Sequence, residues 1–346
     1  MKMKKTAFFL LLFFLLNAVN ASAYEFTKIN RLFSVLENDY VNETNLKNIA
    51  LTSLKTLSDF DENLRFYNND SQAFLYENNN LIGIFELPRE NQNPVLWQEL
   101  LTSVLTTSAQ RSDKLGGRES ELETRILKTM ADNLDIYSRI DDLPSAELDI
   151  RYDKRNNILY VRPTAFFEGI SQKIQTVVTA FPHNSGLIFD LRECRGGSFN
   201  EALRTADLFL DSTIIAYSQG KDNQKRYYTA TPGDILKGKP IAVLTGRITA
   251  SAAELVAAAL SEQSRATLIG TRTYGKNSIQ STYRIKDRIL FLTSGHFYTP
   301  SGKSLEKDGL TPQICTGINN SCISPDSTNS AKDIQIAINL IKKNFG

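Results

Sequence analysis

Ser251 and Lys276 are the residues whose types and surroundings point most directly to chemistry. Ser251 follows an apolar run at residues 241–244 and stands at the start of an alanine-rich stretch, so we expect a helix to begin beside it. Small neighbours let a substrate approach the serine closely, and the next backbone N–H can donate a hydrogen bond to it. A serine placed in this way can act as a nucleophile when a base lies nearby.

Lys276 can be that base. The two histidines, His183 and His296, lie in no recognisable triad context. Burial among apolar strands can lower the pKa of a lysine from about 10.4 to about 7–8, where it accepts a proton near neutral pH. Serine–lysine pairs are an established variant of the catalytic triad. The pair therefore predicts catalysis through an acyl-enzyme.

Simpler explanations exist for both segments. Glu254 lies three positions after Ser251, as in a capping box, so this segment taken alone is better explained as a helix cap. Residues 270–277 nearly match the phosphate-binding loop of nucleotide-binding proteins. Asn277 replaces the hydroxyl that would bind magnesium, and residues 278–285 alternate like a strand, so we reject nucleotide binding.

A pair of glycines forms the third candidate segment. Gly196 and Gly197 follow the apolar run at residues 186–189, and a helix is expected from about Asn200. Such a turn leaves backbone N–H groups free to bind an anionic oxygen. The alternative is a tight turn that needs two glycines for its dihedral angles.

Residues 146–324 contain the elements that must hold these segments. Strand-like runs alternate with helical stretches, which predicts an α/β domain built around a sheet. The runs are residues 158–161, 186–189, 241–244, 268–270 and 289–292, and the helical stretches are 169–180, 200–210 and 252–260. Residues 24–145 read as a mainly helical domain with a small hairpin, and residues 325–346 as a C-terminal helix packed on the core.

The composition excludes several classes of protein. The chain has 346 residues, of which 41% are hydrophobic and 23% charged, with a net charge of +2. This is an ordinary soluble composition without the basic excess of nucleic-acid-binding proteins. No internal apolar run reaches the ~20 residues of a membrane-spanning helix. Two histidines and the lack of a Cys-x-x-Cys pair give no support for a metal site, and we expect no cofactor.

Residues 1–23 read as a secretory signal peptide. A lysine-rich start precedes an apolar stretch at residues 7–16, and Ala21-Ser22-Ala23 matches a signal-peptidase site. We therefore expect cleavage after Ala23 and export to a bacterial periplasm or an equivalent space. The alternative is an uncleaved N-terminal anchor.

The three cysteines fit an oxidising compartment. Cys315 and Cys322 lie close together in sequence and are expected to form a disulfide there, which leaves Cys194 unpaired. Two free thiols are the alternative.

Taken together, the motifs resemble the carboxy-terminal processing proteases, also called tail-specific proteases, which are serine endopeptidases with a Ser/Lys dyad. The match covers most of residues 155–315 without large insertions, and the separations of Ser251, Lys276 and Gln280 agree with the spacing of the family. It runs through residues 186–192, Gly196-Gly197, 249–254, 273–276, 298–304 and 309–312.

The resemblance implies a role for each matched residue. Ser251 would be the nucleophile, Lys276 the general base and Gln280 the residue that orients the lysine. The oxyanion hole would consist of the N–H of Ala252 with that of Gly196 or Gly197. The protease core would then have the crotonase-like α/β spiral, preceded by the helical domain.

Two departures from the family pattern stand out. Family members usually carry a PDZ domain between the helical segment and the protease core. Residues 140–157 are far fewer than the about 50 residues that a domain needs, so we expect this chain to lack it, and recognition of a free C-terminus is open. The three residues that precede the glycine pair, Glu193-Cys194-Arg195, also differ from those usual in the family.

These observations favour an exported serine endopeptidase that cuts unfolded or tail segments of other exported proteins. Its partners would be polypeptide substrates, with no nucleic acid. The alternative is a catalytically weak or inactive scaffold or peptide-binding protein that retains the protease fold. The sequence leaves open whether an adaptor or regulatory partner takes part and which oligomeric state the protein has.

Overall fold

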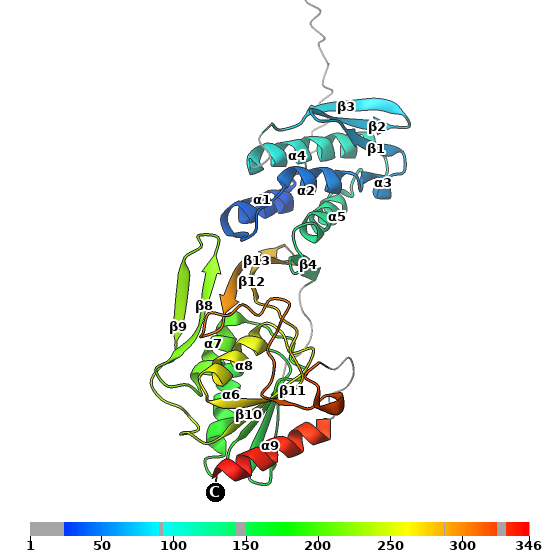
Figure 1. Ribbon diagram of the computed structural model, residues 1–346. Coiled ribbons are helices and arrows are strands. Elements are labelled where there is room, and N and C mark those ends of the chain that lie inside the picture. Colours follow the sequence, from blue (N-terminus) through cyan, green and yellow to red (C-terminus); the bar gives the residue numbers. More distant parts are fainter. Residues whose placement is uncertain (1–23, 90–92, 143–149, 287, 324–329, 346) are drawn as a thin grey trace, which may run out of the picture.

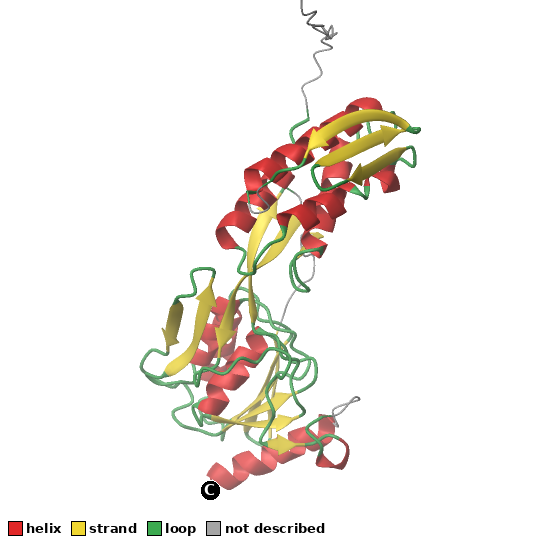
Figure 2. Ribbon diagram, turned by 45° about the horizontal axis from the view of Figure 1, so that its top comes forward, coloured by secondary structure: helices red, strands yellow, loops and turns green. Residues whose placement is uncertain are grey.

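The computed structural model describes residues 24–89, 93–142, 150–286, 288–323 and 330–345. The expected signal peptide lies outside these residues. The described chain is a mixed α/β protein of two bodies joined by a long β-ribbon (Figures 1 and 2). None of the described helices is long and apolar enough to span a membrane.

The N-terminal body packs five helices against a three-stranded antiparallel sheet, β1-β2-β3. Trp97, Leu101 and Leu127 are fully buried in its core. Asn78 and Asn79 both have positive φ and form the turn between β2 and β3, as the two-residue turns of β-hairpins require. The elements are α1 (Thr27–Asp39), α2 (Leu46–Leu54), α3 (Leu57–Phe60), β1 (Leu64–Asn68), β2 (Gln72–Glu77), β3 (Asn80–Glu86), α4 (Pro94–Arg111) and α5 (Glu119–Asp132).

The C-terminal body is built on a six-stranded sheet in the order β14-β11-β10-β7-β6-β5. Its strands are parallel except for β5, which pairs antiparallel with β6. The strands are β5 (Ile150–Arg155), β6 (Ile158–Pro163), β7 (Leu187–Asp190), β10 (Ile241–Thr245), β11 (Ala266–Gly270) and β14 (Ile314–Cys315).

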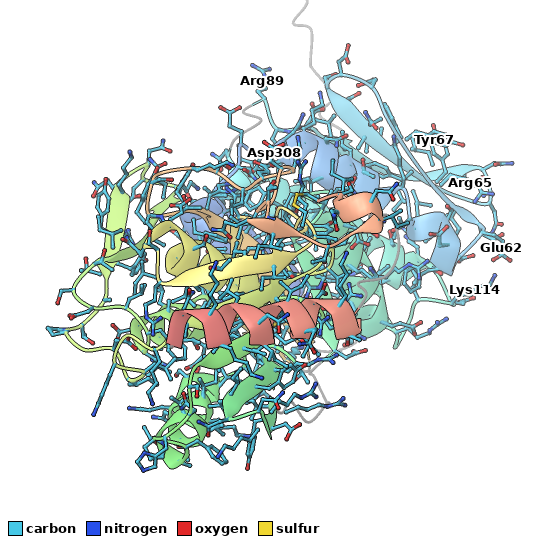
Figure 3. All side chains as sticks on the ribbon, turned by 60° about the horizontal axis from the view of Figure 1, so that its bottom comes forward. Glu62, Arg65, Tyr67, Arg89, Lys114 and Asp308 are labelled. Carbon is cyan, nitrogen blue, oxygen red and sulfur yellow. A yellow bond between two sulfur atoms is a disulfide. The ribbon has the colours of Figure 1, made fainter. Side chains whose placement is uncertain are left out.

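Helices cover both faces of this sheet, which explains why its strands are apolar on both sides. Leu159, Phe189 and Val243 face a core shared with α6 (Ile170–Ala180), α7 (Phe199–Asp207) and α8 (Ala252–Glu262). Ile188 and Leu244 face the other way and pack against α9 (Ser330–Phe345), which lies along the opposite face (Figure 3).

A second sheet links the two bodies. Its order is β12-β13-β8-β9, with β4 also paired to β13. One end of β13 pairs with β8 and the other with β4, and Leu290 and Leu292 of β13 lie in the core of the N-terminal body. The strands are β4 (Arg139–Asp142), β8 (Ile214–Gly220), β9 (Lys225–Thr229), β12 (Ser278–Ile285) and β13 (Arg288–Tyr298). The ribbon therefore fixes the N-terminal body to the strand that follows Lys276.

Candidate active site

Ser251 occupies the turn between strand β10 and helix α8, and its backbone is strained. Its φ of 55° and ψ of −120° lie outside the regions that residues with a Cβ adopt readily. Strained non-glycine residues persist where the surrounding structure holds them, often at functional sites. A serine on a sharp strand-to-helix turn is also the arrangement that exposes the nucleophile in many hydrolases.

Lys276 lies between β11 and β12, and its side-chain nitrogen is 4.4 Å from the centre of the Tyr137 ring. Burial lowers the pKa of Lys276 to about 8, and the positive charge of Arg139 adds to this effect. Asp135 and Glu254 act in the opposite direction. The neutral amine that a general base needs is therefore well populated a little above neutral pH.

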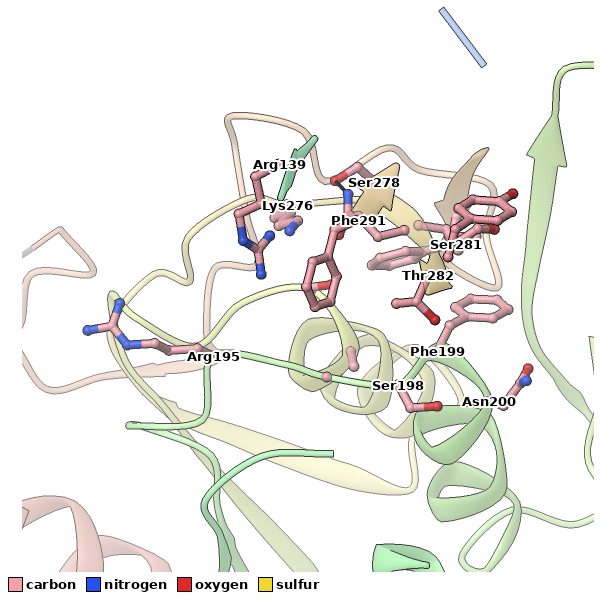
Figure 4. Close-up of a pocket in the computed structure, with 17 residues that line it drawn as sticks. Arg139, Arg195, Ser198, Phe199, Asn200, Lys276, Ser278, Ser281, Thr282 and Phe291 are labelled. Carbon is pink, nitrogen blue, oxygen red and sulfur yellow. Dashed lines mark hydrogen bonds between the residues drawn. The ribbon is translucent and has the colours of Figure 1, made fainter. Parts of the chain in front are cut away.

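Both residues line one pocket of about 790 Å³. In the part of the chain that the structure describes, no hydrogen bond joins the Ser251 hydroxyl to the Lys276 amine. Figure 4 shows Lys276 and Arg139 on one side of this pocket, with Ser198 and Arg195 on the other. The two proposed catalytic groups thus line one cavity without a hydrogen bond between them.

Glu254 connects the backbone of Ser251 to the backbone of Lys276. One carboxylate oxygen accepts the N–H of Ser251 at 2.8 Å and that of Lys276 at 2.9 Å. The other accepts the N–H of Gly275 at 2.7 Å and the hydroxyl of Thr273. The side chain is fully buried, and this burial raises its pKa although the four donors oppose the change. The cap interpreted from sequence is therefore also the link between the two segments of the site.

Gln280 lines the pocket but does not reach the lysine in this structure. Its amide donates to the hydroxyl of Ser278 at 2.9 Å and to that of Thr293 at 3.4 Å. The orienting role that the resemblance implies for Gln280 therefore remains a prediction.

The two glycines of the turn before α7 face different neighbours. A Cβ on Gly196 would lie 2.9 Å from the Cβ of Ser251, and one on Gly197 would lie 2.4 Å from the backbone oxygen of Phe166. Both have positive φ, so both positions require glycine. Gly197 lines the pocket together with Ala252.

None of the three cysteines is among the residues that line the pocket. Cys315 and Cys322 form a disulfide at the end of β14, beside a short 3₁₀ turn (Ile318–Asn320). Cys194 is free and buried, and burial raises its pKa to about 11, which makes it a poor nucleophile. No cluster of metal-binding side chains occurs among the described residues.

Sequence reasoning missed the contribution of the N-terminal body to this site. Tyr137 lies between α5 and β4, and Arg139 is the first residue of β4. Both are far from Lys276 in sequence, yet they contact or influence its amine. The motifs that carry the family resemblance assign no role to either side chain.

Comparisons with known proteins agree with the expected family. Residues 157–316 match the model of peptidase family S41. The carboxy-terminal-processing protease of Bartonella bacilliformis is 35% identical over 173 residues, which are 48% of this chain and 40% of that protein. The carboxy-terminal processing protease CtpA of Bacillus subtilis is 29% identical over 209 residues, which are 58% of this chain and 43% of that protein.

A solved structure, that of a photosystem II D1 C-terminal processing protease, aligns with 52% of each chain at 24% identity and a TM-score of 0.42. The chain spans only about two fifths of the length of the two curated relatives. The sequence similarity lies in the segment that carries Ser251, Lys276 and the two glycines. Residues 157–316 of this chain therefore match peptidase family S41 and are similar in sequence to C-terminal processing proteases.

Proposed function

We propose that this protein is an exported serine endopeptidase that hydrolyses peptide bonds in unfolded or tail segments of exported polypeptides. The observation that carries the proposal is that Ser251, on a strained turn, and Lys276, with a pKa lowered to about 8, open into one pocket. A nucleophile and a base of this kind support an acyl-enzyme mechanism without a cofactor.

The reaction begins with the neutral amine of Lys276, which takes the proton of the Ser251 hydroxyl. The serine oxygen attacks the carbonyl carbon of the substrate, and the N–H groups of Ala252 and Gly197 stabilise the resulting oxyanion. We favour Gly197 over Gly196 because Gly197 lines the pocket together with Ala252. The lysine then donates its proton to the leaving amine, and water hydrolyses the acyl-enzyme by the reverse sequence of proton transfers.

This mechanism requires a movement. Lys276 must leave the Tyr137 ring and approach the Ser251 hydroxyl before the proton transfer, since proton transfer takes place within hydrogen-bonding distance. Two further expectations belong to the same proposal. The protease core would have the crotonase-like α/β spiral, and export would follow from a signal peptide at residues 1–23.

The alternative, an inactive scaffold that retains the fold, finds support in the separation of Ser251 from Lys276. A serine-reactive fluorophosphonate distinguishes the two proposals. The protease should become labelled at Ser251 and should fragment casein, whereas a Ser251→Ala variant should do neither. Silence of the wild-type protein toward both the probe and casein would favour the scaffold.

A further inference from the structure

The pocket follows the edge of strand β12. Its lining includes six consecutive residues, 278–283. Because neighbouring side chains of a strand point to opposite faces of the sheet, a cavity that touches six in a row lies along the strand edge. Within the described chain, β12 pairs only with β13 and leaves its other edge free. An extended peptide can pair with such an edge.

The same pocket is positively charged. Arg139, Arg195 and Lys276 line it, and none of the described lining residues is a carboxylate. Arg139 already pairs with Asp141 at 2.7 Å and lies over the Phe291 ring. Arg195 is exposed, and its side chain has no ion pair or hydrogen bond among the described residues.

Arg195 is also close to the nucleophile. It precedes Gly196, at which an added Cβ would lie only 2.9 Å from the Cβ of Ser251. A carboxylate held by Arg195 would therefore belong to a substrate residue within about two positions of the scissile bond, since an extended chain advances ~3.3 Å per residue.

We propose that Arg195 gives this protease a preference for acidic substrates: an extended polypeptide pairs with the free edge of β12 and presents an Asp or Glu side chain to Arg195. The inference rests on the proposed peptidase function. We favour a side chain over a C-terminal carboxylate because the groove runs along roughly six residues of strand and so accommodates an internal segment of chain.

The test uses peptides that carry a single carboxylate. A peptide that the purified wild-type protein cleaves is mapped by mass spectrometry and then made in Asp, Asn and Lys versions within two positions of the cut. All three are acetylated and amidated, and a fourth version carries Asn with a free C-terminal carboxylate. The enzymes are wild type, Arg195→Gln, Arg195→Glu and the matched control Arg151→Gln, whose exposed arginine lies on β5 outside the pocket.

We expect wild type and Arg151→Gln to cleave the Asp peptide about fivefold faster than the Asn peptide in kcat/KM, with a preference that weakens in salt. Arg195→Gln should cleave the two equally, and Arg195→Glu should prefer the Lys peptide, a reversal that a merely structural role would not produce. Equal cleavage of the Asp and Asn peptides by wild type would overturn the inference and leave the peptidase function intact. A preference for the Asp peptide that survives in Arg195→Gln would do the same. The inference would also be overturned if only the Asn peptide with a free C-terminal carboxylate were cleaved faster than the amidated Asn peptide. Failure of wild type to cleave any peptide or to react with a fluorophosphonate would overturn the peptidase function itself.

Discussion

The side-chain nitrogen of Lys276 lies 4.4 Å from the centre of the Tyr137 ring, so a residue next to the N-terminal body holds the proposed catalytic base. A cation over an aromatic ring is stabilised by about 0.5–2 kcal/mol. This contact favours the protonated lysine, whereas burial favours the neutral one. Tyr137 therefore stabilises a resting state in which the base is charged and apart from Ser251.

Removal of the ring should activate the protein. In Tyr137→Leu the apolar cover remains but the stabilisation of the cation is lost, so the pKa of Lys276 should fall and the neutral amine become more abundant. If the ring stabilises the protonated lysine by ~0.7 kcal/mol, its loss makes the neutral amine about threefold more abundant. We therefore expect Ser251 to react about threefold faster with a fluorophosphonate at pH 7. Tyr137→Phe keeps the ring and serves as the control, with an unchanged rate. A slower reaction in Tyr137→Leu than in Tyr137→Phe would contradict this role.

The pH dependence of catalysis should report the titration of Lys276. Its pKa is lowered to about 8, so the amine is mostly protonated below pH 8 and neutral above it. The value of kcat/KM should fall about tenfold per pH unit below the pKa and level off above it. A profile that is flat between pH 6 and 8 would argue against Lys276 as the base.

Arg139 should set the pH below which kcat/KM falls. Its positive charge helps to lower the pKa of Lys276, while Asp135 and Glu254 oppose it and the Tyr137 ring lies against the amine. In Arg139→Gln the protonated lysine loses a repulsive neighbour, so the pKa of Lys276 should rise. The fall in kcat/KM should then begin at a higher pH. Arg226→Gln, on exposed strand β9 outside the pocket, should keep the wild-type profile. If the fall in kcat/KM moved to lower pH in Arg139→Gln, a charge other than that of Arg139 would control the pKa of Lys276.

Glu254 should be essential for the assembly of the site. An amide offers one acceptor oxygen and one donor group, whereas both oxygens of Glu254 accept N–H donors from the backbone. In Glu254→Gln at least one buried N–H therefore loses its partner. We expect a fall of about 2 kcal/mol in the free energy of unfolding in urea, together with much slower labelling of Ser251.

The matched control for Glu254 is Glu262→Gln, an exposed residue of the same helix that accepts the N–H of Ser301 at 2.8 Å. It should change the free energy of unfolding by less than about 0.5 kcal/mol and leave the labelling intact. Equal stability of Glu254→Gln and Glu262→Gln would mean that the link between Ser251 and Lys276 can be dispensed with.

Local patterns predicted the elements whose signal lies within a short segment. The apolar runs at 158–161 and 241–244 became strands β6 and β10. Strands β8 and β9 were missed. Strand β9 is mostly exposed, carries charges and hydroxyls, and pairs with β8, so it has no apolar pattern of its own. Strand β8 has four consecutive buried residues rather than an alternating pattern, and it pairs with both β9 and β13.

The environment of the site could not be predicted for a related reason. Glu254 follows Ser251 at the spacing of a capping box, and nothing in that spacing indicates that its carboxylate also binds the backbone of Gly275 and Lys276. Tyr137 reaches Lys276 only because β4 pairs with β13. Such long-range contacts arise from sheet pairing, which local sequence patterns do not specify.

Helix α9 should depend on one buried ion pair for its attachment. Arg192 contacts Asp190 at 2.6 Å and Asp333 of α9 at 2.9 Å, and all three side chains are buried. In Asp333→Ala the buried guanidinium of Arg192 keeps Asp190 but loses one of its two carboxylate partners. Loss of a partner from a buried charge lowers the free energy of unfolding by about 3 kcal/mol. We expect a lower urea midpoint and faster tryptic cleavage within α9, while labelling of Ser251 persists under native conditions because α9 covers the far face of the sheet. Asn339→Ala, an exposed change on the same helix, should match wild type, and an unchanged midpoint in Asp333→Ala would show that the apolar contacts of α9 suffice.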